Sequence, residues 1–167
     1  MIKLDLNQCS ERVLKAYAED AKNPENIRQL LKEKEEVVYV ELAGNLHADK
    51  ETLRYLYERY ARTDTSTFCA IVFRSLFSNP STPTDLLIKL ASKIYSKDAA
   101  TEFLRNPSIP KEAIDILFKQ YGKSLEIAEK MICHENTSAQ TLINIATEHE
   151  QLAHEVLATG KVKLVES

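Results

Sequence analysis

The stretch NPSTPTDLLIKLA occupies residues 79–91, and the similar stretch NPSIPKEAIDILF follows at residues 106–118. Both begin with Asn-Pro, carry a second proline four residues after the asparagine, and continue into a segment rich in Leu and Ile. If the two stretches belong to an internal repeat, aligning the whole chain on them should bring apolar residues into common columns.

The alignment produces such columns. Asn79 and Asn106 are its anchors, and weaker copies are placed at Asn45, Glu135 and Gly160. The residues three positions before the anchors are Leu42, Leu76, Phe103, Ile132 and Leu157, and those eight positions after the first four anchors are Leu53, Leu87, Ile114 and Ile143. Further apolar columns lie seven and two positions before the anchors, and this spacing marks one face of an α-helix. Each unit is predicted to be a helix, a short turn at the anchor, and a second helix.

The residues of the turns agree with this prediction. The residue before a proline avoids the α region, so Asn-Pro is typical of the end of a helix, whereas Pro83 and Pro110 suit the first turn of the next one. Asp49, Thr82 and Ser138 would supply capping oxygens at three of the helix starts.

The segment before the first anchor is less regular. Asn23-Pro24 predicts a helix start, and the charged run KEKEE at residues 32–36 is either an exposed part of one long helix over residues 24–43 or a break between two helices. One long helix is favoured. VVYVEL (37–42) and TFCAIVF (67–73) are rich in strand-forming residues, but they occupy the same column as helical segments, so helices are predicted; a mixed α+β fold is the alternative.

Composition excludes several functions. The 167-residue chain has 44% hydrophobic residues and 22 Lys and Arg against 25 Asp and Glu, with a net charge of −3. This is typical of a soluble globular protein and offers no general attraction to nucleic acid or anionic lipid. The chain has no apolar run long enough for a membrane helix and no signal peptide pattern, and its three cysteines are widely spaced, so a cytoplasmic protein with reduced thiols is expected.

Motifs for catalysis, cofactors and metals are absent from the sequence. It contains no G-x-S-x-G, P-loop, G-x-G-x-x-G, C-x-x-C or H-E-x-x-H. Cys133, His134, His149 and His154 are the metal-ligand candidates, but the two later histidines are five residues apart, which does not place both on one helix face. Neither an enzyme nor a metal or cofactor is expected.

The phrase N-P-S/T-x-P, followed by two amphipathic segments, resembles the variant leucine-rich repeats, and the longer helix pairs are similar to HEAT-type α-solenoids. The resemblance is clearest over residues 79–118 and extends over 45–160. It implies an all-α fold, a right-handed α-solenoid-like stack of about four to five antiparallel helix pairs. A single domain over residues 1–167 is expected, with irregular helices in 1–44. One variant leucine-rich repeat protein carries an N-terminal cysteine cluster for iron and sulfur; this chain lacks it, so the resemblance implies no cofactor.

Such solenoids mainly bind proteins, and a minority bind nucleic acid. The binding face is usually lined by the second helices, whose outward columns differ in chemistry between the units here, although a merely solvated face would also look like this. The candidate partner-binding residues are Glu41, Arg74, Ser75, Glu102, Arg105, Lys130 and His134. We therefore expect a non-catalytic protein-binding module, an adaptor or an inhibitor such as an immunity protein against a toxin or a phage-type antagonist. A nucleic-acid-binding repeat protein is the alternative, and an enzyme is less favoured.

Overall fold

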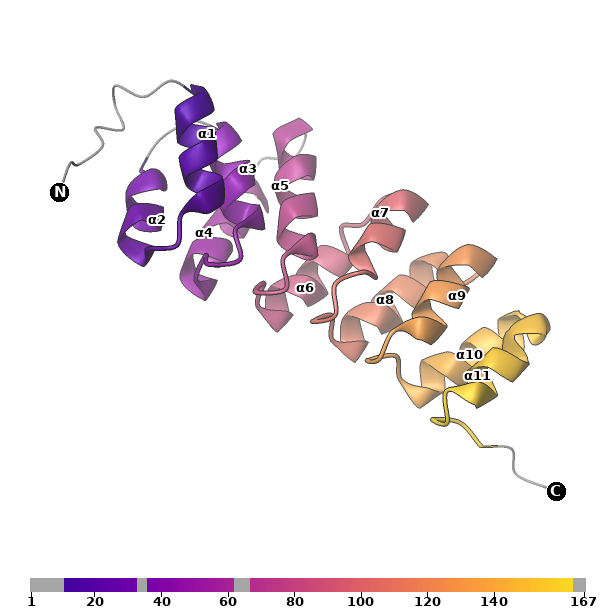
Figure 1. Ribbon diagram of the computed structural model, residues 1–167. Coiled ribbons are helices and arrows are strands. Elements are labelled where there is room, and N and C mark those ends of the chain that lie inside the picture. Colours follow the sequence, from indigo (N-terminus) through magenta and orange to yellow (C-terminus); the bar gives the residue numbers. More distant parts are fainter. Residues whose placement is uncertain (1–10, 33–35, 62–66, 164–167) are drawn as a thin grey trace. The chain divides into compact units, whose positions relative to one another are not determined.

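The computed structural model describes residues 11–32, 36–61 and 67–163 (Figure 1). Within these ranges the chain forms α-helices joined by short turns and one 3-10 helix, with no β-strand, which confirms the prediction of an all-α protein. The strand-prone segments VVYVEL and TFCAIVF lie in α3 (Glu36–Gly44) and α5 (Thr67–Ser78). Their helical conformation shows that burial in the core overrides local strand propensity.

Contacts divide the chain into two compact units, Met1–Leu86 and Leu87–Ser167, and the boundary falls inside α6 (Thr84–Ala91). We call them the N-terminal and the C-terminal unit. A single domain over residues 1–167 stays a prediction.

In the N-terminal unit, α3 packs against both α1 and α5, and α4 packs against α3 and α5. The further helices of this unit are α1 (Glu11–Asp20), α2 (Pro24–Leu30) and α4 (Lys50–Ala61). Its core consists mainly of Leu, Val, Ile and Tyr side chains that are at most 2% exposed, among them Ile27, Leu30, Val38, Tyr39, Leu42, Leu53, Leu56 and Leu76.

The prediction of one long helix over residues 24–43 is wrong. α2 ends at Leu30 and α3 begins at Glu36. Within the run KEKEE, residues 32–35 lie between the two helices and include no apolar side chain whose burial would stabilise a continuous helix. Two separate helices let the apolar faces on both sides of the run reach the core. Residues 33–35 themselves lie outside the described ranges, as does Cys9.

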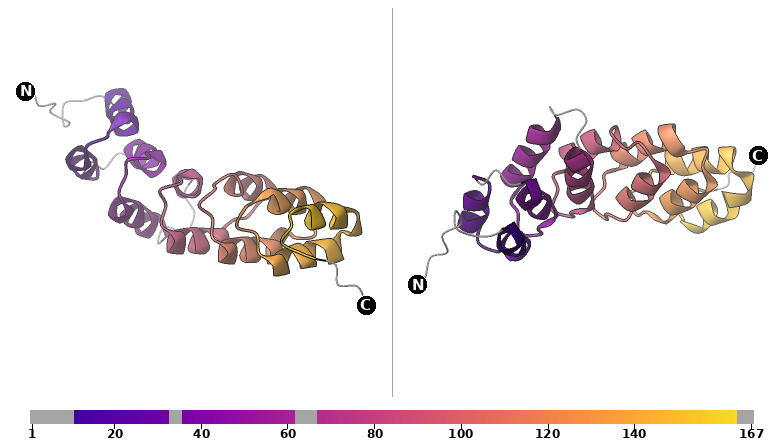
Figure 2. Two further views of the ribbon diagram at one scale, coloured as in Figure 1. Left: turned by 60° about the horizontal axis from the view of Figure 1, so that its bottom comes forward. Right: turned by 90° about the horizontal axis from the view of Figure 1, so that it is seen from above.

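The C-terminal unit has two layers of helices, with α8 and α10 in one and α7, α9 and α11 in the other (Figure 2). The helices are α7 (Lys97–Phe103), α8 (Lys111–Tyr121), α9 (Leu125–Cys133), α10 (Ala139–Glu148), η2 (Glu150–Leu152) and α11 (Ala153–Ala158). Between the layers lie fully buried side chains from both, including Phe103, Ile114, Leu117, Ile127, Met131, Leu142 and Ile145.

Burial places the last two anchors of the sequence alignment one residue earlier than predicted, at His134 instead of Glu135 and at Thr159 instead of Gly160. Met131 is fully buried whereas Ile132 is half-buried, and Leu142 is fully buried whereas Ile143 is 44% exposed. A hydrogen bond gives independent support for this register. Thr137 Oγ1 donates to Met131 O at 2.5 Å, as Thr82 Oγ1 donates to Leu76 O at 2.5 Å.

Two of the three predicted helix caps are confirmed. Asp49 Oδ1 accepts from Thr52 N–H at 2.8 Å, and Ser138 Oγ accepts from Thr141 N–H at 3.1 Å. The third is wrong, because the Thr82 hydroxyl donates backward to the end of α5 and Pro83 separates it from α6. Thr82 therefore closes the preceding helix instead of starting the next.

Candidate functional site

The side chains of Asn79 and His134 each tie the turn of their own anchor to the turn of the preceding helix pair. In the N-terminal unit, Asn79 Nδ2 donates to Ala43 O at 2.9 Å and to Asn45 O at 3.0 Å, while Asn79 Oδ1 accepts from Ser81 N–H at 2.9 Å. Asn79 is only 2% exposed. The buried amide thus satisfies backbone groups that neither helix can satisfy internally.

His134 performs the same role in the C-terminal unit. Its Nδ1 accepts from Asn136 N–H at 3.2 Å, and its Nε2 lies 3.1 Å from Asn106 O. Since a carbonyl oxygen can only accept, Nε2 carries the hydrogen and the ring is the neutral tautomer. His134 is 7% exposed. This predicted partner-binding residue therefore holds the turn, and its side chain is largely shielded from solvent.

A second set of side chains links consecutive turns in this unit. Asn136 Nδ2 donates to Pro107 O at 3.3 Å and to Ile109 O at 2.8 Å. In the next turn, the ammonium group of Lys161 donates to the carbonyl oxygens of Glu135 and Thr137. The two donors, Asn136 and Lys161, each lie two positions after the anchor of their own turn. The carbonyl groups that accept from them lie one and three positions after the anchor of the preceding turn. These bonds hold the C-terminal ends of α7, α9 and α11 side by side.

The opposite edge of the unit is tied in a comparable way. Tyr121 Oη donates to Ile94 O at 3.0 Å, and His149 Nε2 lies 2.7 Å from Gly122 O. His149 is 9% exposed. With both edges bonded, the position of α9 beside α7 is set at both ends of the helices.

Between α7 and α9 lies a groove of about 570 Å³, which we call the α7–α9 groove. Its α7 side is formed by Thr101, Leu104, Arg105 and Pro107, and its α9 side by Glu129, Lys130, Cys133, His134 and Glu135. Most of these side chains lie at the outward columns of the sequence alignment, so this surface corresponds to the binding face predicted from the sequence.

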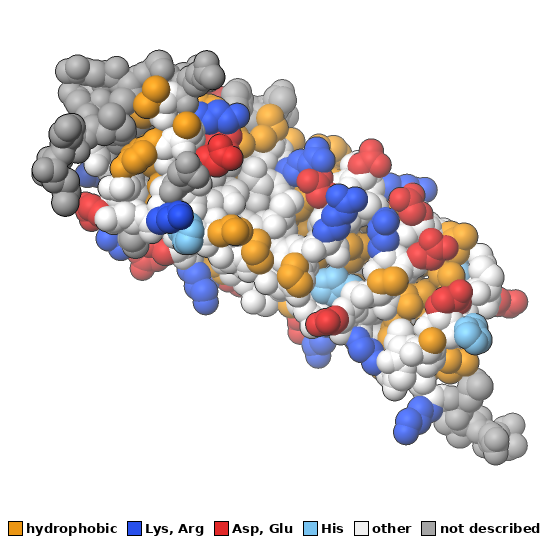
Figure 3. Space-filling model, in the orientation of Figure 1, with side chains coloured by type: hydrophobic (Ala, Val, Ile, Leu, Met, Phe, Trp, Pro, Cys, Tyr) orange, Lys and Arg blue, Asp and Glu red, His pale blue; other side chains and the backbone are white. Residues whose placement is uncertain are grey.

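The charged side chains of this groove remain available to a partner. Arg105, Glu129 and Glu135 are exposed and Lys130 is half-buried. None of the four forms an ion pair with another residue in the described part of the chain. Figure 3, which looks onto the layer of α7, α9 and α11, shows basic and acidic side chains interspersed there. The groove thus presents both charges on a partly apolar floor.

The structure brings three of the seven predicted site residues together, since Arg105, Lys130 and His134 all line the α7–α9 groove. Glu102 lies on α7 outside this lining, where it is half-buried. The remaining three belong to the N-terminal unit. Of these, Glu41 forms an ion pair with Lys15 at 3.1 Å, Arg74 is exposed and Ser75 is half-buried.

Sequence reasoning missed Glu129, Cys133 and Glu135 because the fourth anchor was placed one residue too late. The error assigned Met131 to an outward column, although it is fully buried. A signal was present: Thr137 stands three residues after His134, as Thr82 stands three residues after Asn79. The sequence did not reveal that His134 takes the place of the anchor asparagine.

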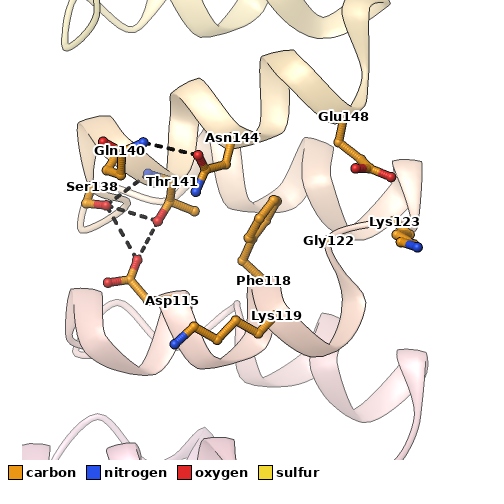
Figure 4. Close-up of a pocket in the computed structure, with 10 residues that line it drawn as sticks. All are labelled: Asp115, Phe118, Lys119, Gly122, Lys123, Ser138, Gln140, Thr141, Asn144 and Glu148. Carbon is orange, nitrogen blue, oxygen red and sulfur yellow. Dashed lines mark hydrogen bonds between the residues drawn. The ribbon is translucent and has the colours of Figure 1, made fainter.

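A second pocket, of about 420 Å³, lies between α8 and α10 (Figure 4). The aromatic ring of Phe118 stands between the two helices, with Lys119 and Lys123 on the α8 side. At one end, the carboxylate of Asp115 accepts from the hydroxyls of Ser138 and Thr141. These bonds join the N-terminal turn of α10 to α8, so the polar residues at this end of the pocket support the packing of the two helices.

The described residues contain no group of three or more His, Cys, Asp or Glu side chains placed to hold a metal ion. In the same residues no helix has the length and apolar character that crossing a membrane requires. Comparison with protein-family models, with curated proteins and with solved structures finds no match to this chain. Any functional inference therefore depends on the groove itself.

Proposed function

We propose that this protein is a non-catalytic protein-binding module and that the α7–α9 groove receives its partner. We also propose that its helix pairs form a solenoid-like stack, similar to HEAT-type or variant leucine-rich repeats. The repeated hydrogen bonds from anchor side chains to the preceding turn support this arrangement, because they give successive helix pairs the same relative placement.

One observation carries the proposal. The columns three positions before and eight positions after the anchors hold buried apolar residues in each described helix pair, whereas the columns that line the groove differ from one helix pair to the next. At the position five before the anchor stand Thr101 and Glu129, and at the position before the anchor stand Arg105 and Cys133. Invariant scaffold columns beside variable surface columns are typical of repeat proteins that recognise a specific partner.

The charges of the groove favour a protein over a nucleic acid. Arg105 and Lys130 are balanced by Glu129 and Glu135 within the same groove. A phosphate backbone would be attracted by the first pair and repelled by the second. A protein segment can place opposite charges against both pairs, which contributes to specificity and to the rate of association.

The proposed biological role is that of an adaptor or an inhibitor, such as an immunity protein or a phage-type antagonist. No catalytic constellation is proposed. A binding module needs only a scaffold and a recognition surface, and stable interfaces bury a total of about 1,200–2,000 Å². We expect the groove to hold the central part of such an interface.

The test is affinity capture of the partner from cells that express the tagged full-length chain. The groove variant combines Arg105→Glu with Lys130→Glu. The control variant combines Lys119→Glu with Lys123→Glu, which changes the net charge equally at the α8–α10 pocket, whose lining shares no residue with the groove. We expect the groove variant to retain less than a tenth of the captured protein and the control variant to retain most of it.

Equal capture by the wild type and the groove variant would exclude the α7–α9 groove as the site. Capture that disappears after nuclease treatment, with binding that falls steeply between low and moderate salt, would replace the proposal by nucleic-acid binding. Circular dichroism of both variants shows whether either has lost its helical structure.

A further inference from the structure

The charged side chains of the α7–α9 groove follow a definite order along its length. Since the ends of α7 and α9 are joined through His134 and Asn106, residues at equal distance from their anchors lie at equal height. On the α9 side, Glu129 lies five positions before the anchor His134, Lys130 lies four positions before it, and Glu135 lies one position after it. On the α7 side, Arg105 lies one position before the anchor Asn106. The order along the groove is therefore acidic, basic, basic, acidic.

The dimensions of this pattern suit a helical partner. Glu129 lies in α9, about 6 Å before the last residue of that helix, Cys133. Glu135 lies two residues beyond Cys133, which adds at most about 7 Å. On a helix laid along the groove, residues at i, i+4 and i+7 share one face and span about 10 Å, which lies within this limit. The floor beneath them includes Leu104, Pro107 and the exposed Cys133, which suits an apolar side chain on the same face.

We propose that the α7–α9 groove binds an α-helix of another protein that presents one acidic residue between two basic residues, about one helical turn away on either side. This inference rests on the proposed protein-binding function and specifies its partner. The acidic residue lies between Arg105 and Lys130, and the basic residues meet Glu129 and Glu135.

The opposite pattern is rejected for an electrostatic reason. A helix with a basic residue between two acidic ones would place like charges against all four groove residues. Because three of these side chains are exposed, each contact contributes little by itself and is weakened by salt. Selectivity arises from the sum of the contacts and is greatest at low ionic strength.

Cys133 allows this proposal to be measured directly, because its exposed thiol lies within the groove. The full-length chain is prepared with Cys9→Ser and Cys69→Ser, which leaves one thiol. It is equilibrated in a thiol redox buffer with either of two helical peptides that each carry one cysteine near the centre. The first peptide presents Arg, Glu and Arg at i, i+4 and i+7, and the second presents Glu, Arg and Glu. Compensating charges on the far face equalise their net charge.

The mixed disulfide is quantified by intact mass. We expect the first peptide to give an equilibrium constant at least fivefold higher than the second at low salt. In a chain that also carries Arg105→Glu, Lys130→Glu, Glu129→Lys and Glu135→Lys, the preference should reverse. Equal yields for both peptides, or a preference unchanged by these four substitutions, would overturn the proposed charge pattern.

A second arm keeps the test decisive if the fourfold variant does not fold. Glu129→Gln and Glu135→Gln together remove charge without reversing it and should reduce the preference at least twofold, whereas Lys119→Glu with Lys123→Glu should leave it unchanged. The result is independent of affinity capture. If the groove variant loses the partner while the peptides are not distinguished, protein binding stands and the charge pattern falls.

Discussion

The Nε2 atom of His134 lies 3.1 Å from the carbonyl oxygen of Asn106, in the same relationship that joins Asn79 Nδ2 to Asn45 O at 3.0 Å. A neutral imidazole offers one donor and one acceptor, as a carboxamide offers a donor and an acceptor on adjacent atoms. The two residue types are therefore equivalent at this turn, although their side chains differ in shape and chemistry.

His134→Asn should consequently leave the free energy of unfolding almost unchanged. His134→Ala should lower it by about 1–2 kcal/mol, because the buried Asn106 carbonyl loses one of its donors and the part-buried Asn136 N–H loses its acceptor. Urea unfolding of the three proteins followed by circular dichroism provides the measurement. If Asn destabilises the protein as much as Ala does, the assigned equivalence of the anchors is incorrect.

The threonines that close α5 and α9 should also contribute to stability. Thr82 and Thr137 are at most 4% exposed, and each donates its hydroxyl to a helix-end carbonyl. Thr137→Val preserves the shape but leaves Met131 O without this donor, so we expect a loss of about 1 kcal/mol. Thr147→Val is the matched control, because its bond to Ile143 O is exposed and water replaces it. Equal effects of the two substitutions would refute the prediction.

Gly122 is required by close packing at the end of α8. A Cβ atom at this position would lie 2.5 Å from Phe118 O and 2.6 Å from two atoms of the Phe118 ring. Gly122→Ala should therefore destabilise the protein by about 1–3 kcal/mol, which is the usual cost of overpacking. Gly44→Ala serves as the comparison, since nothing lies within 4 Å of its Cβ, and it should be neutral or slightly stabilising. Thermal unfolding of both variants distinguishes these outcomes.

Asp49 should make the stability of the protein depend on pH. The backbone N–H of Thr52 holds the pKa of Asp49 below its ordinary value of 3.8, with a smaller contribution from Arg28, against an opposing effect of burial. Because the pKa is lower in the folded state, this stabilisation is present above the ordinary pKa and is lost as pH falls through the folded value.

Asp49→Ala should accordingly lower the free energy of unfolding by about 1 kcal/mol at pH 7, as the loss of a helix cap does. The difference from wild type should shrink below about pH 4. Asp49→Asn retains an accepting oxygen but cannot ionise, and should remove the pH dependence while keeping most of the stability. Urea titrations at pH 7 and pH 3 measure the free energy of unfolding of each protein. If Asp49→Ala lowers it by the same amount at both pH values, this account is contradicted.

Periodicity in the sequence was sufficient to predict the helical class and the buried residues three positions before and eight positions after the first three anchors. Leu53, Leu76, Phe103 and Ile114, all fully buried, were identified because apolar residues recur at helical spacing beside proline-containing turns. These features follow from local stereochemistry and periodicity, which do not require knowledge of distant contacts.

The register of the last two helix pairs and the composition of the groove became apparent only from contacts between distant residues. The anchor His134 has no proline beside it and does not resemble Asn in sequence, and its role depends on the carbonyl group of Asn106, 28 residues earlier. The same is true of the break after Leu30, since whether a charged run continues a helix depends on where the flanking apolar faces are buried. Contacts between distant residues set these features, and the local pattern that accompanies the anchor, a threonine three residues after it, does not reveal that His and Asn are equivalent there.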